Sequence, residues 1–142
     1  MIVAGPASRH VVVILPAEGE AAPEYGPLCV RLHSSDLRTI VFEPDERPDA
    51  AAVLAGMDSE RIGWAHVVGA GAGATVGWDL AATTFGRVQS LIMLDYAVAE
   101  PVARVEAPAT MLTTTPAALA DARTARRSVF SDVRIVDLTE TG

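Results

Sequence analysis

Hydrophobic residues recur along the chain in short runs that are separated by polar, turn-rich stretches. The first run, VVVIL at residues 11–15, is continuous and β-branched and is followed by Pro16, which is typical of a strand buried on both faces of a sheet. Similar runs predict five further strands, at residues 38–42, 64–68, 88–94, 110–112 and 133–138. The pattern therefore predicts a sheet of about six strands.

The stretches between these strands carry hydrophobic residues at helical spacing. Pro23 fits the first turn of one helix, Asp49 fits the N-cap of the next, and Gly86 is a natural stop for a third. The predicted helices cover residues 23–34, 50–54, 75–85 and 116–130. Strands that alternate with helices predict a three-layer α/β/α sandwich around a mostly parallel sheet.

Composition narrows the class of protein. The 142 residues make one domain, 1–142, and half of them are hydrophobic, while aromatic residues are only 5%, so the core is aliphatic. The net charge of −7 argues against a nucleic-acid partner or an anionic membrane surface, which both require clustered cations. All fixed side-chain cations are arginines, which excludes mechanisms that need a lysine.

The few cysteines and histidines predict neither disulfides nor a metal site. Cys29 is the only cysteine, and the three histidines are scattered without paired spacing. There is no basic leader at the N-terminus, and no apolar run approaches about 18 residues. We therefore expect a cytoplasmic protein with no metal and no cofactor.

A glycine-rich turn, GAGAGA at residues 69–74, follows the third predicted strand and opens a helix. Gly69, Gly71 and Ala74 match the spacing of a dinucleotide-binding fingerprint, in which Asp95 at the end of the next strand would hold a ribose hydroxyl. That fingerprint normally follows the first strand of its fold. A dinucleotide-binding module is therefore the third interpretation that we carry forward.

Several segments in the correct order resemble the α/β-hydrolase family. The segment HVVGAGAG at residues 66–73 is similar to the family's strand and nucleophile elbow, H-V-V-G-H-S-x-G, with Gly71 at the serine position. The segments WDLAA and FGRVQSLIMLD resemble the elbow helix and the strand after it, and FEPDER resembles the A-P-D-x-R-G ending of an earlier strand. The resemblance implies a small sheet in the spatial order 2-1-3-4-5-6, without a cap domain or early antiparallel strands.

The resemblance also implies which catalytic parts are missing. Gly71 has no side chain to attack an acyl carbon, and no histidine follows the last predicted strand. Asp95 stands at an acid position that only a minority of the family uses, and without a histidine it has nothing to orient. Glu18 would place negative charge where an oxyanion develops.

These departures favour a non-catalytic homologue that binds a small molecule or a protein. The alternative is an enzyme, such as a hydrolase, lyase or isomerase, that uses the same pocket without a serine. The residues expected to form the binding site are Ala17, Glu18, Gly19, Ala70, Gly71, Ala72 and Asp95.

We also expect a homodimer. The connection at residues 96–107 is too short for a long covering helix, and no helix follows the last predicted strand. A sheet of Val, Ile and Leu requires burial on both faces, and an exposed apolar face of that extent marks an interface.

Overall fold

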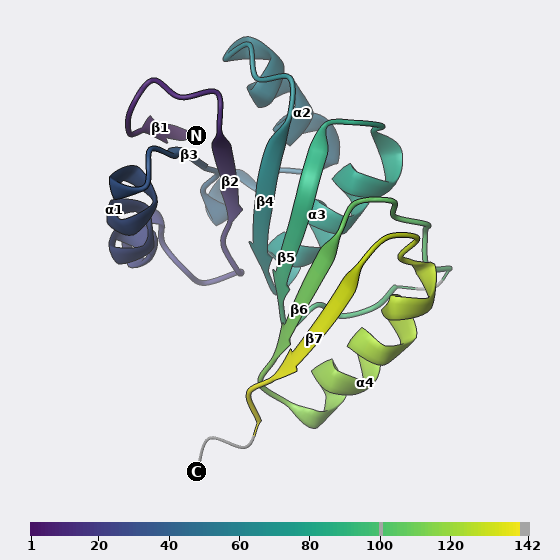
Figure 1. The fold of residues 1–142 in the computed structure, drawn as a ribbon. Coiled ribbons are helices and arrows are strands. Elements are labelled where there is room, and N and C mark those ends of the chain that lie inside the picture. Colours follow the sequence, from purple (N-terminus) through teal and green to yellow (C-terminus); the bar gives the residue numbers. More distant parts are fainter. Residues whose placement is uncertain (100, 140–142) are drawn as a thin grey trace.

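The computed structural model contains one seven-stranded sheet in the spatial order β1-β3-β2-β4-β5-β6-β7 (Figure 1). The structure describes residues 1–99 and 101–139. All neighbouring strands are parallel except β1 and β3. The strands are β1 Ile2–Ala4, β2 Val11–Leu15, β3 Arg38–Val41, β4 Ala65–Ala70, β5 Val88–Leu94, β6 Ala109–Thr113 and β7 Val133–Asp137.

The predicted order of six parallel strands is confirmed, because β2 to β7 follow it along the sheet. The expectation that the chain lacks an early antiparallel strand is wrong. Ile2 pairs with Val41 and Ala4 pairs with Thr39, which makes β1 an antiparallel edge strand. At three residues, this strand is too short to show the alternation from which strands are recognised.

Four α-helices connect the strands, and local capping explains where two of them begin. The Asp49 side chain accepts a hydrogen bond from the Ala52 N–H, and the Thr115 hydroxyl accepts one from the Ala118 N–H. The helices are α1 Gly26–Ser34, α2 Ala50–Ser59, α3 Ala72–Thr83 and α4 Pro116–Ala125. Helix α3 begins three residues earlier than predicted, because the turn at Gly71 leads directly from β4 into the helix.

The sheet separates two hydrophobic cores of unequal size. The larger core lies between the sheet and α2, α3 and α4, and Trp78 of α3 is its largest fully buried side chain. The smaller core lies on the other face, where α1 packs on β2 and β3. This is the predicted three-layer arrangement, but the layer formed by α1 covers only one side of its face (Figure 1).

The connection between β5 and β6 closes the larger core without a helix in its described part. Trp78 stacks on Tyr96 with ring centroids 5.1 Å apart, and its indole N–H donates to the Ala103 carbonyl oxygen. Val105 is fully buried and bridges to Val129. On this face the expectation of an exposed sheet is therefore wrong. Within the described residues, no helix is long and apolar enough to cross a membrane.

Candidate functional site

Gly71 occupies a sharp turn between β4 and α3. Its backbone has φ +53° and ψ −119°, a conformation that costs an L-amino acid considerable strain and that glycine adopts freely. The Gly71 N–H donates to the Leu94 carbonyl oxygen of β5, which fixes the turn at the carboxyl edge of the sheet. This strained strand-to-helix turn is the geometry that a nucleophile elbow requires.

The two flanking glycines, Gly69 and Gly73, allow the strand and the helix to approach closely. A β-carbon on Gly69 would lie 2.5 Å from the Gly73 carbonyl oxygen, and one on Gly73 would lie 2.0 Å from the Leu15 carbonyl oxygen. No side chain fits at these separations. A β-carbon on Gly71 itself would meet only Ala17, at 3.3 Å, so the elbow residue faces the loop after β2.

That loop is held by an internal carboxylate. Oε1 of Glu20 accepts the Ala17 backbone N–H at 2.7 Å and the Tyr25 hydroxyl at 2.6 Å. Burial, followed by the hydrogen bond and charge of Glu20, raises the pKa of the Tyr25 phenol well above its usual value. An N–H group beside the elbow, which in a hydrolase would face a developing oxyanion, is therefore already bound to a negative group. The sequence suggested Glu18 for this effect, whereas the structure assigns the contact to Glu20.

Asp95 is also engaged within the protein. It directly follows β5 with a positive φ of 51°, and its carboxylate accepts the Thr114 backbone N–H at 2.7 Å and the Thr114 hydroxyl at 2.5 Å. Both carboxylate oxygens therefore bind the loop after β6. A role for Asp95 in orienting a base or holding a ribose would require these two bonds to be replaced.

The three histidines lie away from the elbow. His66 is the second residue of β4, so it lies at the amino end of the strand whose carboxyl end leads to Gly71. Its Nδ1 is 2.8 Å from the Ser90 hydroxyl. His10 precedes β2 and packs edge-on against Trp64. His33 is half-buried, with Nε2 2.9 Å from the Thr39 hydroxyl. None of them can act as a base at Gly71.

A cavity of about 420 Å³ opens beside the elbow, a size typical of small-molecule sites. Phe42 of the loop after β3, Val76 of α3 and Pro48 give it apolar walls, and Glu18 and Arg47 are its charged residues. Its full lining is Leu15, Pro16, Glu18, Phe42, Arg47, Pro48, Ala72, Gly73 and Val76. The cavity lies at the carboxyl ends of the strands, where α/β sheets bind ligands.

A second cavity of about 360 Å³ shares Glu18 and Arg47 with the first. Its remaining lining is Gly19, Glu20, Ala21, Glu43 and Asp45. Four carboxylates against one guanidinium give this second cavity a net negative charge. Because it shares Glu18 and Arg47 with the apolar cavity, we call it the acidic entrance.

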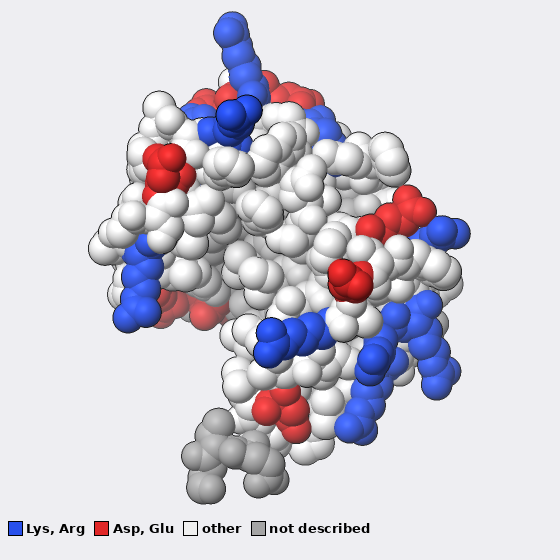
Figure 2. All heavy atoms as spheres, viewed as in Figure 1, with Lys and Arg blue, Asp and Glu red and all other residues white. Residues whose placement is uncertain are grey.

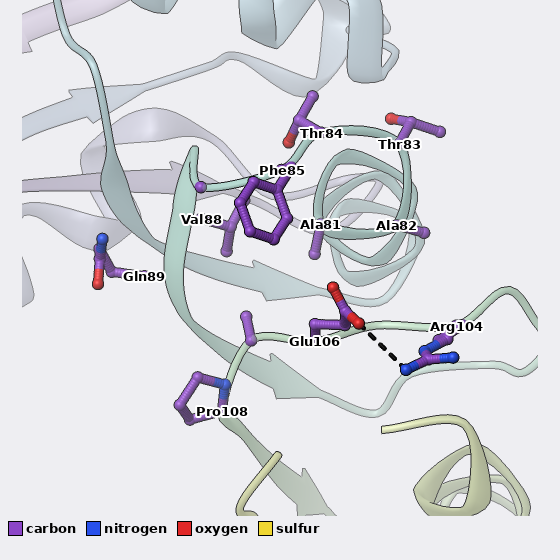
Figure 3. A pocket seen from close by; sticks show the side chains of 12 residues that line it. Ala81, Ala82, Thr83, Thr84, Phe85, Val88, Gln89, Arg104, Glu106 and Pro108 are labelled. Carbon is purple, nitrogen blue, oxygen red and sulfur yellow. Dashed lines mark hydrogen bonds and ion pairs between the residues drawn. The ribbon is translucent and has the colours of Figure 1, made fainter. Parts of the chain in front are cut away.

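A third cavity, of about 640 Å³, lies at the opposite end of the sheet (Figure 3). It is bordered by the end of α3 and by residues that precede β5 and β6, so it opens at the amino ends of the strands. Phe85 projects over it, and Arg104 forms an ion pair with Glu106 at 3.1 Å (Figure 3). Its place in the sheet separates it from the elbow.

The predicted binding residues are only partly brought together. Ala17 and Gly71 face each other, Glu18 and Ala72 line the elbow cavity, and Gly19 lines its entrance. Ala70 is buried at the end of β4, and Asp95 lines neither cavity. Sequence reasoning missed Phe42, Arg47 and Val76 as lining residues, although it had placed the segment with Arg47 at the correct edge of the sheet.

No family model matches the sequence, and no curated protein shows significant sequence similarity to it. The fold is similar to that of an alpha/beta hydrolase enzyme from the metagenome of Mar Chica lagoon sediments, with TM-score 0.76 and 11% identity over 96% of this chain and 83% of that one.

Two further solved structures have the same overall fold. A dienelactone hydrolase from Anabaena variabilis aligns with TM-score 0.74 and 15% identity over 96% of this chain and 78% of that one. An enol-lactonase from Burkholderia xenovorans aligns with TM-score 0.74 and 12% identity over 95% and 86%. At these identities the similarity concerns the fold.

Proposed function

We propose that this chain, whose fold is that of the α/β-hydrolases, binds a small, mainly apolar molecule beside Gly71 and does not carry out serine-hydrolase chemistry. Three features found together support this proposal. The backbone has the geometry of an elbow, the elbow residue has no side chain, and an open cavity of about 420 Å³ lies beside it. The scaffold for positioning a ligand is present, and the attacking group is absent.

The surrounding groups support binding over catalysis. Acyl transfer requires a nucleophile, a base and free donors for the oxyanion. Among the described residues that line the cavity, the ionisable side chains are Glu18 and Arg47, and the Ala17 N–H is bound to Glu20. Ala72 and Gly73 begin α3, whose first N–H groups have no partner within the helix and remain suited to polar contact with a ligand.

The entrance indicates the ligand class. The apolar walls favour an aliphatic or aromatic body, and the four carboxylates around Arg47 favour a neutral or cationic head group over a carboxylate. We therefore expect a compact amine or a neutral polar-headed compound to bind more tightly than an acid of equal chain length.

Protein-observed ¹H–¹⁵N NMR titration with hexylamine, hexanol and hexanoate tests this proposal. The amine and the alcohol should bind and perturb the amides of Ala72 and Val76, and hexanoate should bind at least about tenfold more weakly, the factor that about 1.4 kcal/mol of electrostatic difference gives. The variant Val76→Phe, which fills the cavity, should abolish these shifts.

The variant Phe85→Ala, at the distant cavity, is the matched control and should leave binding unchanged. Binding that survives Val76→Phe, or shifts confined to the surroundings of Phe85, would contradict the proposed site.

An enzyme that uses the same pocket without a serine is the second candidate, because the cavity has the size of a substrate site. If the wild-type protein hydrolyses short-chain esters and the variant Val76→Phe does not, the result would favour an enzyme over a binding protein. A dinucleotide-binding module remains the third candidate, and titration with NAD and NADP would detect it.

A further inference from the structure

One half of a sheet face is left without a covering helix among the described residues. The registers align Val68 with Ile92 and Thr110 in one row, and Leu94 with Leu112 and Val136 in the next. Their neighbours in the strands, such as Leu91 and Met111, belong to the core beneath α3 and α4, so these two rows point to the opposite face. None of the six side chains is fully buried.

The same face carries α1, but only over β2 and β3. Cys29 and Leu32 of α1 pack with Val12 and Ile14, whereas Ile92, Leu94 and Leu112 are outside this core. The layer on this face is therefore half complete: a helix on one side, and an open sheet beside it (Figure 1). Val68 packs against the edge of the smaller core, so the uncovered part is formed by the other five residues, and we call Ile92, Leu94, Thr110, Leu112 and Val136 the open face.

Helix α1 itself presents apolar surface away from its own sheet. Cys29 and Leu32 face the sheet. Each residue of an α-helix is rotated by about 100° from the one before it, so Val30 lies about 100° beyond Cys29 and about 200° before Leu32. This rotation places Val30 on the side of the helix that faces away from the sheet. Its side chain is 64% exposed. Pro27 is also exposed on the outer side of the helix. Arg31 and Ser34 share this outer side with Val30 and Pro27. An open sheet and a helix that exposes Val30 and Pro27 thus lie next to each other in one layer.

From this arrangement we infer that the chain forms a two-fold dimer, in which α1 of each copy packs its outer side on the open face of the other. A two-fold axis parallel to the strands and between the two α1 helices exchanges the covered and uncovered halves of the layer. Each copy then supplies the helix that the other lacks, and the contact closes after two copies.

The charges of these surfaces permit a second copy despite the net charge of −7. Neither α1 nor the open face contains an Asp or Glu residue; their charged groups are arginines, such as Arg31 of α1 and Arg134, which stands beside Thr110 in the sheet. Figure 2 shows the middle of this face as uncharged and hollowed, with charged side chains around it. Two acidic molecules can therefore meet there without bringing carboxylates together.

The exposed area also fits a dimer of moderate size. The chain exposes 7701 Å², against roughly 7000 Å² expected of a compact monomer of 14.9 kDa. The chain therefore leaves more surface uncovered than a compact monomer of its mass does, and a standard interface buries roughly 800 Å² on each partner.

Sedimentation equilibrium over low to high micromolar concentration tests the inference with three proteins. The wild-type chain should approach twice 14.9 kDa as concentration rises. The variant Val30→Asp should raise the dimer dissociation constant at least about tenfold, because it buries a carboxylate in the contact. Phe85→Asp, at a side chain 91% exposed on the opposite end of the sheet, should behave as the wild type.

Val30 is outside both cores, so its substitution should leave the fold intact, which far-UV circular dichroism and the melting temperature of the diluted protein check. A wild-type chain that stays at 14.9 kDa overturns the inference. A dimer that Val30→Asp does not weaken, or that Phe85→Asp weakens equally, overturns it as well. The outcome is independent of whether the elbow cavity binds a ligand.

Discussion

Gly73 packs directly against the backbone of Leu15: a β-carbon at Gly73 would lie 2.0 Å from the Leu15 carbonyl oxygen. The obstacle is main chain at the end of β2, so it cannot rotate away as a flexible side chain can. This contact brings the first turn of α3 against the end of β2 and thereby sets the distance between the elbow and the loop at Ala17.

Substituting Gly73 should therefore be costly. We expect Gly73→Ala to lower the free energy of unfolding by more than about 2 kcal/mol through overpacking, and Gly73→Val to cost more. Urea denaturation followed by circular dichroism measures the change. Gly63→Ala is the matched control, because nothing lies within 4 Å of its added β-carbon and its φ is not positive. Equal urea midpoints for the Gly73 and Gly63 variants would contradict the close packing.

A serine at the elbow should be tolerated but inactive. The β-carbon of Gly71→Ser would meet Ala17 at 3.3 Å, and the positive φ should cost about 1–3 kcal/mol of stability. The hydroxyl would have no histidine beside it, and a serine without a base is a weak nucleophile. We expect no stoichiometric labelling by a fluorophosphonate.

The variant Gly71→Ala is the control for the serine substitution, because it carries the same backbone strain without a hydroxyl. The two variants should unfold at similar urea concentrations. Stoichiometric labelling of Gly71→Ser would reveal a base that the cavity lining does not provide.

The contact of Glu20 with Tyr25 should be visible in the titration of the phenol. In a Tyr96→Phe background Tyr25 is the only tyrosine, and its pKa should lie well above 10. Adding Glu20→Gln removes the negative charge but keeps an oxygen that can accept the Ala17 N–H. The pKa should then fall toward 10 while burial still holds it above that value. Phenolate absorbance measures both titrations, and equal titration curves would show that Glu20 does not contact the phenol.

The pattern of hydrophobic runs predicted the strands and a mostly parallel sheet, because each run is a local feature of the sequence. The order of the strands in space and the elbow were implied by the resemblance to the α/β-hydrolase family. The side chains around the elbow depend on separate loops. Glu20 reaches Ala17 only through the turn that joins them, and Phe42 and Val76 meet across a strand and a helix. Nothing in the local sequence distinguishes Glu20 from Glu18. The negative charge beside the elbow was therefore expected from Glu18, whereas Glu20 makes the contact.

The local sequence pattern also could not show which residues cover each face of the sheet. The connection before β6 was expected to leave its face exposed because it has no room for a long helix. It covers the core instead with single side chains, among them Val105, and with the carbonyl of Ala103 that binds Trp78. The opposite face, beside α1, is the one that remains open.

His66 should make the stability of the protein depend on pH. Burial, and then the charge of His10, lower the pKa of His66 below 6.5, so the folded chain favours the neutral imidazole. When the pH falls below 6.5, the unfolded chain binds a proton that the folded chain does not yet bind. Stability contributed by His66 is thus complete above about 6.5 and is lost as the pH falls toward the lowered pKa of the folded state.

Urea denaturation at a series of pH values and one fixed protein concentration measures this loss. Carboxylates also titrate in the acidic range, so the comparison with His66→Gln isolates the contribution of His66: the variant should lose less stability than the wild type between pH 6.5 and pH 5. His10→Gln should raise the pKa of His66, because it removes the second cause of the shift. An NMR titration that places the His66 ring at or above 6.5 in the folded wild-type protein would show that the imidazole is not desolvated beside Ser90.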